Sequence, residues 1–164
     1  MNKDTVIISA FPGTGKSYIK NNNRGGNVIL DSDSSLFSWL YNKDGSLVSP
    51  RTRNPDFPNN YIKHIKDNIG IADIIFISSH DIVRDALKKN NIKFITVYPH
   101  IDLMDEYIRR YRLRGNDESF TDFMQLNWSH FITEMHNDNL CYQLNAGEYI
   151  SSVLEDIIIA YRSH

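Results

Sequence analysis

An apolar, β-branched run that leads straight into a glycine-rich segment and a lysine is the feature that most constrains this chain. The run is TVIISAF at residues 5–11, and PGTGKS follows it. This order of residues fits a buried strand that turns sharply into a helix, because glycine permits the tight turn and Lys16 and Ser17 can begin the helix. Residues 10–17 therefore match the Walker A pattern, with Ala10 where the first glycine usually stands.

The spacing of this motif suits the binding of a phosphate chain. Gly13 and Gly15 allow successive backbone N–H groups to face an anion at the start of the following helix. Lys16 can place a positive charge on the β- and γ-phosphates, and the Ser17 hydroxyl can bind Mg²⁺. The motif predicts a site for ATP and Mg²⁺; the alternative is a glycine-rich turn without nucleotide. The predicted nucleotide-binding residues are Gly13, Thr14, Gly15, Lys16, Ser17 and Tyr18.

Four more short apolar runs predict further strands. They lie at residues 27–31, 73–78, 93–99 and 140–144. Between the runs, apolar residues recur with the helical period within residues 82–87, 120–135 and 150–161. Ser119, three residues before Asp122, resembles a capping box for the second of these helices. Strands that alternate with helices predict an α/β fold, in which a five-stranded parallel sheet carries helices on both faces.

Composition indicates one domain and argues against several classes of protein. A chain of 164 residues, 41% of them hydrophobic, can bury one core, so we expect residues 1–164 to form a single domain. The formal net charge of −2 is unlike that of a general nucleic-acid coat protein, although a local basic patch could bind nucleic acid. The single Cys141 cannot form an intramolecular disulfide, which favours a reducing compartment. No signal-like start or membrane-length apolar run is present, so we expect a cytoplasmic protein with no membrane partner.

Two carboxylates follow the second predicted strand. Asp31 and Asp33 end the stretch VILDSD, and a parallel sheet would place both at its carboxyl edge, beside the phosphate-binding loop. A kinase that acts on an alcohol benefits from a positioned carboxylate base, whereas an acceptor that is already a phosphate needs none. The alternative is that both residues only form a turn with the neighbouring serines.

The third predicted strand helps to separate the two roles. It ends on Ser78 and Ser79, without the acidic residue that a Walker B strand supplies, so the magnesium carboxylate must come from elsewhere. We therefore predict Asp31 as the magnesium residue beside Ser17, and Asp33 as the acceptor base. His80 follows at the same edge, where it could contact substrate or metal. A histidine that begins a helix and bonds to the backbone is an equally good explanation.

An arginine-rich segment at residues 102–118 is predicted to form a lid. Arg109, Arg110, Arg112 and Arg114 share one short helix that ends at Gly115. Guanidinium groups there can clamp a triphosphate, so we predict Arg109 as nucleotide-binding and Arg110 and Arg114 as catalytic. Ordinary surface ion pairs with the preceding acidic residues are the alternative.

Residues 34–60 interrupt the regular alternation and are predicted to be an acceptor-binding insertion. Aromatic residues interleaved with arginines suit a stacked base and a phosphate. The predicted acceptor-binding residues are Phe37, Trp39, Arg51 and Arg53. Core packing is the alternative for some of the aromatic residues, and Tyr61 with Ile62 and Ile65 is typical of a buried helix face.

Five stretches, spread over most of the chain, resemble a group of phage-associated P-loop kinases related to the 5-hydroxymethyluridine DNA kinases. They are ISAFPGTGKS, LDSDSSLFSW, RNPDFPNNYIKHIK, FISSHDIVRDAL and YIRRYRLRGN, in that order. The first stretch is common to many nucleotide-binding proteins, whereas the second and third are far more specific. The kinases of that group phosphorylate the hydroxymethyl group of a modified pyrimidine in phage DNA.

The resemblance implies a three-layer P-loop NTPase fold with strand order 2-3-1-4-5, and an ATP-dependent kinase of the host cytoplasm. It implies Lys16 and Ser17 as nucleotide and magnesium residues, and Asp33 as the acceptor base. The implied acceptor is the 5-hydroxymethyl group of 5-hydroxymethyl-deoxyuridine in phage DNA. Two alternatives stay open: a nucleoside monophosphate kinase, in which Arg51 and Arg53 would grip the acceptor phosphate, and a non-catalytic ATP-binding regulatory module.

Overall fold

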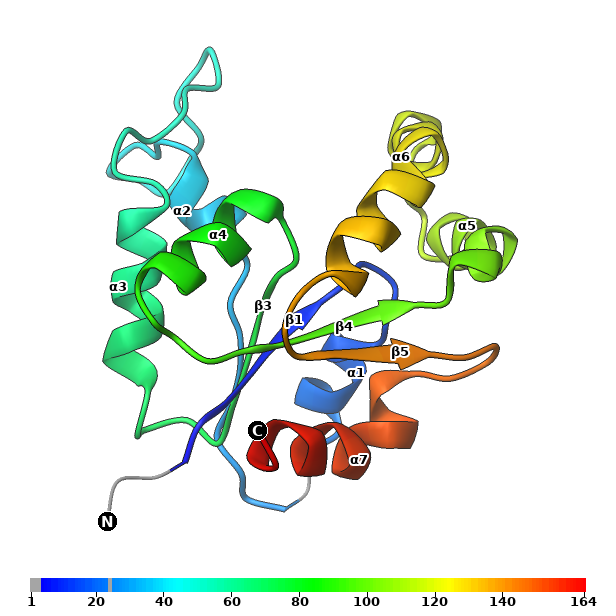
Figure 1. Cartoon of the computed structure of the whole chain (residues 1–164). Coiled ribbons are helices and arrows are strands. Elements are labelled where there is room, and N and C mark those ends of the chain that lie inside the picture. Colours follow the sequence, from blue (N-terminus) through cyan, green and yellow to red (C-terminus); the bar gives the residue numbers. More distant parts are fainter. Residues whose placement is uncertain (1–3, 24) are drawn as a thin grey trace.

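A five-stranded, all-parallel sheet forms the centre of the molecule in a computed structural model that describes residues 4–23 and 25–164 (Figure 1). The strand order is β2-β3-β1-β4-β5, which confirms the predicted α/β fold and topology. Each neighbouring pair runs parallel, so the carboxyl ends of the strands meet at one edge of the sheet. The strands are β1 (Val6–Ala10), β2 (Ile29–Asp31), β3 (Ile74–Ser78), β4 (Ile95–Pro99) and β5 (Cys141–Leu144).

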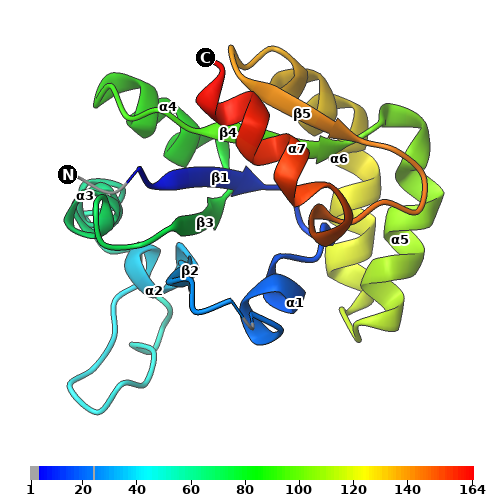
Figure 2. The same ribbon diagram turned by 90° about the horizontal axis from the view of Figure 1, so that it is seen from below.

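Helices cover both faces of this sheet, as Figure 2 shows from below. The helices are α1 (Lys16–Asn21), α2 (Ser35–Ser38), α3 (Asn59–Asn68), α4 (Asp81–Lys89), the 3₁₀ turn η1 (Ile101–Leu103), α5 (Met104–Leu113), α6 (Glu118–His136) and α7 (Ile150–Arg162). None of the helices in the described residues is both long enough and apolar enough to cross a membrane.

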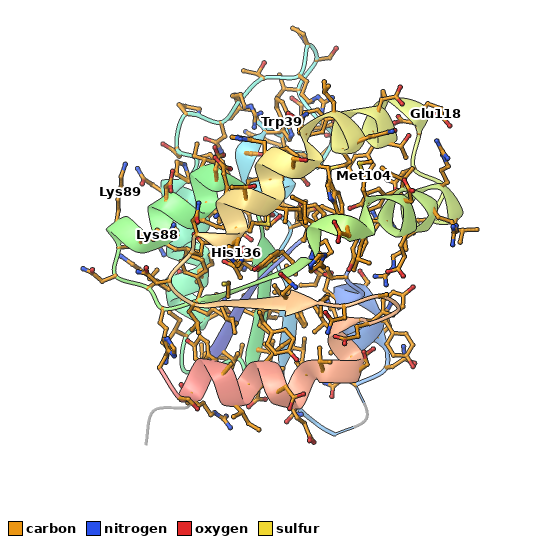
Figure 3. All side chains as sticks on the ribbon, turned by 45° about the vertical axis from the view of Figure 1, so that its right-hand side comes forward. Trp39, Lys88, Lys89, Met104, Glu118 and His136 are labelled. Atoms are coloured by element: carbon orange, nitrogen blue, oxygen red, sulfur yellow. The ribbon has the colours of Figure 1, made fainter. Side chains whose placement is uncertain are left out.

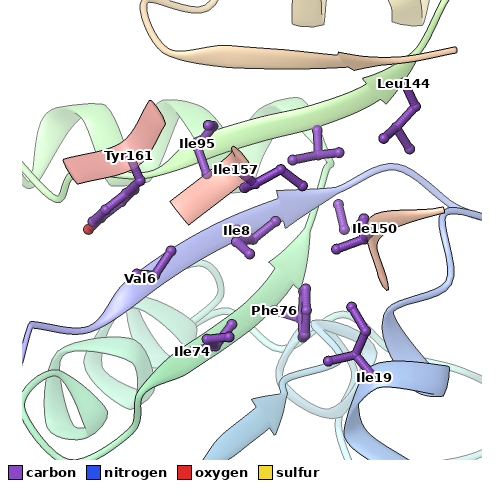
Figure 4. Close-up of a cluster of buried hydrophobic side chains, with 12 residues drawn as sticks. Val6, Ile8, Ile19, Ile74, Phe76, Ile95, Leu144, Ile150, Ile157 and Tyr161 are labelled. Atoms are coloured by element: carbon purple, nitrogen blue, oxygen red, sulfur yellow. The ribbon is translucent and has the colours of Figure 1, made fainter. Parts of the chain in front are cut away.

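Alternate residues of the central strand β1 face different helices. Val6 and Ile8 pack with Ile157 of α7 in one cluster of buried side chains, which Figure 4 shows. Ile7, between them, packs with α3 and α4 in a second cluster on the opposite face. Because side chains of a strand alternate between its two faces, this run must be largely apolar to bury both of them, and its one polar residue, Ser9, donates its hydroxyl to the Ser78 carbonyl at 3.2 Å. The continuous apolar runs in the sequence are the result.

The start of α6 differs from the predicted capping box. The N-cap is Asp117, whose side chain accepts a hydrogen bond from the Phe120 N–H at 2.9 Å. Ser119 lies inside the first turn, and its hydroxyl donates to Asp117 at 2.9 Å instead of capping the helix itself. The prediction from Ser119 and Asp122 was therefore wrong. An aspartate two residues earlier reaches the same free N–H groups, and its charge is favourable at this end of a helix.

Helix α5 ends at Leu113, and Gly115 follows directly after its C-cap residue Arg114, as predicted for the end of this helix. Gly115 has a φ of +86°. The Gly115 N–H donates to the Arg112 carbonyl, and the Asn116 N–H donates to the Tyr111 carbonyl. These two bonds form a Schellman motif, which glycine permits because it adopts the left-handed conformation without strain.

Residues 39–53 form an arm that extends away from the body of the molecule (Figures 1 and 2). Two isolated antiparallel bridges, Trp39 with Arg53 and Tyr41 with Leu47, join its two sides. The arm lies between α2 and α3, within the predicted insertion at residues 34–60.

A buried ion-pair network joins α4, β4 and the end of α6. Asp138, 7% exposed, accepts hydrogen bonds from Arg84 at 2.8 Å, Lys88 at 2.6 Å and Thr96 at 2.7 Å. Figure 3 labels Lys88 on α4 and His136 at the end of α6. Burial acts to raise the pKa of Asp138, but the hydrogen bonds from these three residues outweigh it, so the pKa is lowered.

Asp138→Asn should destabilise the fold by about 3 kcal/mol, because it leaves the buried Arg84 with only the more distant and more exposed carboxylate of Glu134, at 3.7 Å. Asp4→Asn breaks only an exposed pair with Arg162 and should cost less than about 1 kcal/mol. Urea unfolding at pH 7 measures both. Since folding lowers the pKa of Asp138, its contribution is present above the unfolded-state pKa and is lost as the pH falls through the folded-state value. Equal losses for the two variants would contradict a stabilising role for the network.

Candidate active site

The glycine-rich loop between β1 and α1 is held in place through its carbonyl oxygens. Four consecutive carbonyls accept hydrogen bonds, one from a side chain of the loop itself and three from groups outside it. The donors are Thr14 Oγ1 to Phe11 at 2.7 Å, Tyr111 Oη to Pro12 at 2.9 Å, Arg110 Nη1 to Gly13 at 2.8 Å, and the Ile150 N–H to Thr14 at 2.9 Å. Elements α5 and α7, far apart in sequence from the loop, therefore fix its shape.

The amide side of the loop carries free donors. In the described part of the chain, the N–H groups of Gly13, Thr14 and Gly15 donate to no protein acceptor. Consecutive N–H groups left free by a loop of this shape form a concave anion-binding surface. The loop therefore has the donor arrangement that its sequence predicts for a phosphate chain.

Two glycines of the loop are required by both conformation and packing. Gly13 has a φ of +84°, and a Cβ atom there would lie 2.9 Å from Tyr111 Cε1. Gly15 has a φ of +90°, and a Cβ atom there would lie 3.0 Å from Tyr149 Cδ1. The aromatic rings of α5 and of the turn before α7 thus occupy the space that a larger residue would need.

The loop forms one wall of a cavity of about 670 Å³ at the carboxyl edge of the sheet. Its lining comes from the loop, the ends of β2 and β3, the lid helices and the turn before α7. The lining residues include Lys16, Ser17, Tyr18, Asp33, Ser78, His80, Arg110, Arg114 and Tyr149. Residues from five parts of the sequence therefore meet around the predicted phosphate site.

Asp31 joins the two polar side chains at the start of α1. Its Oδ2 accepts a hydrogen bond from Ser17 Oγ at 3.4 Å, and its Oδ1 lies 3.7 Å from Lys16 Nζ. A carboxylate and a hydroxyl are the oxygen ligands that Mg²⁺ accepts when water and phosphate complete its coordination. The Ser17 and Asp31 donor set therefore fits the predicted magnesium site.

Asp33 has a different environment from Asp31. Its side chain is exposed and lines the cavity. Oδ1 accepts a hydrogen bond from the Ser35 N–H at 2.9 Å, as in an Asx turn, so the turn-forming alternative is also met. A carboxylate has further acceptor positions beyond this bond. Asp33 can therefore accept a hydrogen bond from a ligand while it keeps the turn.

The end of β3 lacks an acid, as predicted. Ser78 occupies the last position of the strand, opposite Ala10 of β1 in the register. Its hydroxyl donates to Ser34 Oγ at 2.7 Å. The hydroxyl therefore links β3 to the segment that follows β2.

His80 lies at the N-cap of α4 and lines the cavity. Desolvation by the cavity wall lowers the pKa of its imidazole. The charges of Asp81 and Asp33 oppose this shift, whereas those of Arg53 and Lys16 add to it. The pKa of the imidazole is thus below its usual value, and the ring lies within electrostatic range of Asp33, Lys16 and Arg53.

The structure separates the arginines of the predicted lid. Arg110 is 9% exposed, and besides Gly13 it donates to the Glu148 carbonyl and to Glu106, each at 3.0 Å. Its guanidinium also stacks on Tyr149, with 3.9 Å from Cζ to the ring centroid. Arg110 therefore contacts protein groups on several sides, where we expected a side chain free to clamp phosphates.

The other lid arginines are more exposed. Arg114 lines the cavity and donates to Asn116 Oδ1 at 3.1 Å. Arg109 is exposed, and Arg112 lies 4.0 Å from Glu118 in a surface ion pair. In Figure 3 the labels Met104 and Glu118 mark the first residues of α5 and α6. Of the three predicted lid residues, Arg110 and Arg114 line the cavity and Arg109 does not.

The predicted acceptor-binding residues do not line the cavity. Phe37 packs on Tyr61 and His64, with centroid distances of 5.2 and 4.9 Å. Trp39 lies against the guanidinium groups of Arg51 and Arg53, whose Cζ atoms are 4.5 and 4.1 Å from its ring centroid. Phe37 is thus part of the packing around α3, as the core-packing alternative expects. The structure brings Trp39, Arg51 and Arg53 together on the arm.

Sequence reasoning missed Tyr149, which contacts Gly15 and Arg110. Glu106 accepts a hydrogen bond from Arg110, four residues further on, as the ion-pair alternative expects, and also one from the Gly147 N–H, which the sequence did not indicate. Tyr149 directly precedes a strongly periodic helix, but no motif marks it. The contacts of Tyr149, and that of Glu106 with Gly147, join distant segments, which a pattern search cannot find.

Comparison with known proteins supports the fold. The sequence matches no protein-family model and none of the curated proteins. The structure is similar to that of a gluconokinase from Sinorhizobium meliloti 1021, with a TM-score of 0.53, 10% sequence identity, and coverage of 99% of this chain and 93% of that chain. Identity this low shows the fold alone. The chain therefore has a P-loop kinase-like fold.

Gly13→Ala should abolish nucleotide binding, because the new methyl group would collide with Tyr111 and displace the loop amides. Gly45→Ala on the arm is the matched control: it has a φ of +88°, but nothing lies within 4 Å of the added atom. Both variants should lose about 1–2 kcal/mol of stability from backbone strain. Binding of a fluorescent ATP analogue separates them. Normal binding by the Gly13 variant would exclude this loop as the nucleotide site.

Proposed function

We propose that this protein is an ATP-dependent phosphotransferase whose acceptor is an alcohol. The observation that carries the proposal is that two neighbouring carboxylates have different environments. Asp31 contacts Lys16 and Ser17, whereas Asp33 lines the cavity. The kinase-like fold and the free loop amides also support it.

Each group has a distinct part in the proposed reaction. The loop amides and Lys16 bind the phosphates of ATP, and Lys16 stabilises negative charge on the phosphoryl group during transfer. Ser17 and Asp31 would hold Mg²⁺, which would neutralise phosphate charge. Asp33 accepts the proton of the acceptor hydroxyl, whose oxygen bonds to the γ-phosphorus as the bond to the bridging oxygen breaks and ADP leaves. Arg114 approaches the phosphates from the lid.

For the acceptor we propose the 5-hydroxymethyl group of 5-hydroxymethyl-deoxyuridine in DNA. The sequence resemblance supports this choice. Two features of the site also support it: β3 ends on Ser78 and not on an acidic residue, and Asp33 lines the cavity, where it can serve an alcohol. The arm carries the positive charges of Arg51 and Arg53. It lies close enough to the cavity for the charge of Arg53 to lower the pKa of His80. We propose that Arg51 and Arg53 contact phosphates of the DNA strand.

A panel of acceptors tests this choice. Transfer from γ-labelled ATP should be seen with oligodeoxynucleotides that contain 5-hydroxymethyluracil, and not with matched oligonucleotides that contain thymine. Transfer to deoxynucleoside monophosphates alone would instead identify a monophosphate kinase. ATP binding without transfer to any acceptor would favour a regulatory module.

Lys16→Ala should lower the rate of phosphoryl transfer at least 10²-fold, equivalent to about 3 kcal/mol of transition-state stabilisation. Lys20→Ala, on the same helix and exposed, is the matched control and should transfer at the normal rate. Steady-state turnover with labelled ATP and circular dichroism of both variants provide the measurement. Normal turnover in the Lys16 variant would remove that residue from the reaction.

Asp33→Asn should keep ATP affinity but lower transfer by about 10²- to 10⁴-fold, because an amide retains the hydrogen bond to Ser35 and cannot act as a base. Asp31→Asn should instead raise the Mg²⁺ concentration needed for half-maximal turnover. Titrations of ATP and Mg²⁺ distinguish the two. Small and equal effects would support the turn-forming alternative for both carboxylates.

A further inference from the structure

Asp33 lies between two anchored neighbours. Ser32 and Ser34 are buried, with exposures of 7% and 5%, whereas the Asp33 side chain between them is exposed in the cavity. The direction in which Asp33 points therefore depends on the groups that bind the two serines.

Tyr61 of α3 fixes the peptide group that joins Ser32 to Asp33. Its hydroxyl donates to the Ser32 carbonyl oxygen and accepts from the Ser78 N–H at 3.4 Å. The tyrosine is fully buried. Burial raises the pKa of Tyr61, and the negative charges of Asp33 and Asp31 act in the same direction. The hydroxyl thus stays protonated and able to donate.

Ser78 fixes the other neighbour of Asp33. Its Oγ donates to Ser34 Oγ at 2.7 Å and accepts from the Ser34 N–H at 3.3 Å. On the first side, Ser32 Oγ also pairs with His64 Nε2 of α3 at 2.8 Å. Bonds from β3 and α3 thus hold the backbone on both sides of Asp33, and α2 packs against α3 directly after it.

We propose that Tyr61 and Ser78 are positioning residues that hold Asp33 in the geometry needed to accept the proton of the acceptor alcohol. The inference rests on the proposed function and extends it to two uncharged residues. Loss of either hydroxyl retains the Asp33 carboxylate but releases the backbone that sets its direction. Displacements of about 1 Å in such groups reduce rates by up to about 10²-fold.

Tyr61→Phe tests the proposal, with Tyr161→Phe as the matched control. Tyr161 is also buried, and its hydroxyl lies 3.1 Å from the Thr5 carbonyl oxygen and 3.4 Å from that of Lys93, among residues packed on the opposite face of the sheet. Each variant therefore loses a buried tyrosine hydroxyl that contacts two backbone groups. Only the Tyr61 variant should show faster amide hydrogen exchange in residues 32–38.

The kinetic test uses labelled ATP and an oligodeoxynucleotide that contains 5-hydroxymethyluracil. For Tyr61→Phe we expect kcat to fall by about 10- to 100-fold while the KM for ATP stays unchanged. Tyr161→Phe should keep the normal kcat. Faster exchange in residues 32–38 with a normal kcat would overturn the proposal, and so would unchanged exchange.

Two further results keep the inference separate from the proposed function. If the unmodified protein transfers no phosphate to the oligonucleotide, the proposed acceptor fails, and hydrogen exchange alone decides whether Tyr61 holds the Asp33 segment. If Tyr61→Phe does not fold, Ser78→Ala takes its place and should speed exchange at Ser34 and lower kcat in the same way. Normal exchange and kcat in that variant would overturn the proposal.

Discussion

The hydrogen bonds to the carbonyl oxygens of residues 11–14 are the constraint on which the site depends. A short glycine-rich loop has many conformations, and only a few of them turn successive amides to one side. Arg110 and Tyr111 from α5 and the start of α7 select one of them. The same contacts bring α5 and the turn before α7 to the wall of the cavity, so the glycine-rich loop and the elements around it form one packed unit.

A second constraint acts at the neighbouring strand ends. The acid that many nucleotide-binding folds place on the third strand is replaced by Ser78, and the negative charge lies on Asp31, the last residue of β2, and on Asp33, two residues beyond it. β2 has only three residues in the ladder, and all three are only partly buried. Carboxylates at the end of so short a strand need outside support, and Tyr61, His64 and Ser78 provide hydrogen bonds that hold this segment.

The outcome for the arginines shows how far residue type can mislead. Four arginines on one helix predict a phosphate clamp, since nothing in the sequence distinguishes Arg110 from Arg109 or Arg114. The structure buries Arg110 between two tyrosine rings and binds it to two backbone carbonyls, whereas Arg109 is exposed. A guanidinium group is equally suited to bind carbonyls and phosphates, so its role depends on what the fold places beside it.

Strand positions follow from the sequence, because continuous apolar runs between helical stripes indicate strands buried on both faces of a parallel sheet. Their order was implied by the resemblance to known kinases and not by the runs themselves. The glycines and Lys16 also follow from the sequence, because their spacing has a local backbone reason. Tertiary structure alone decided which aromatic residues pack, as with Phe37 on α3, and which pair with arginines, as with Trp39. It also decided how Asp33 is held. Those outcomes depend on contacts between segments tens of residues apart, whose energies appear only once the chain has folded.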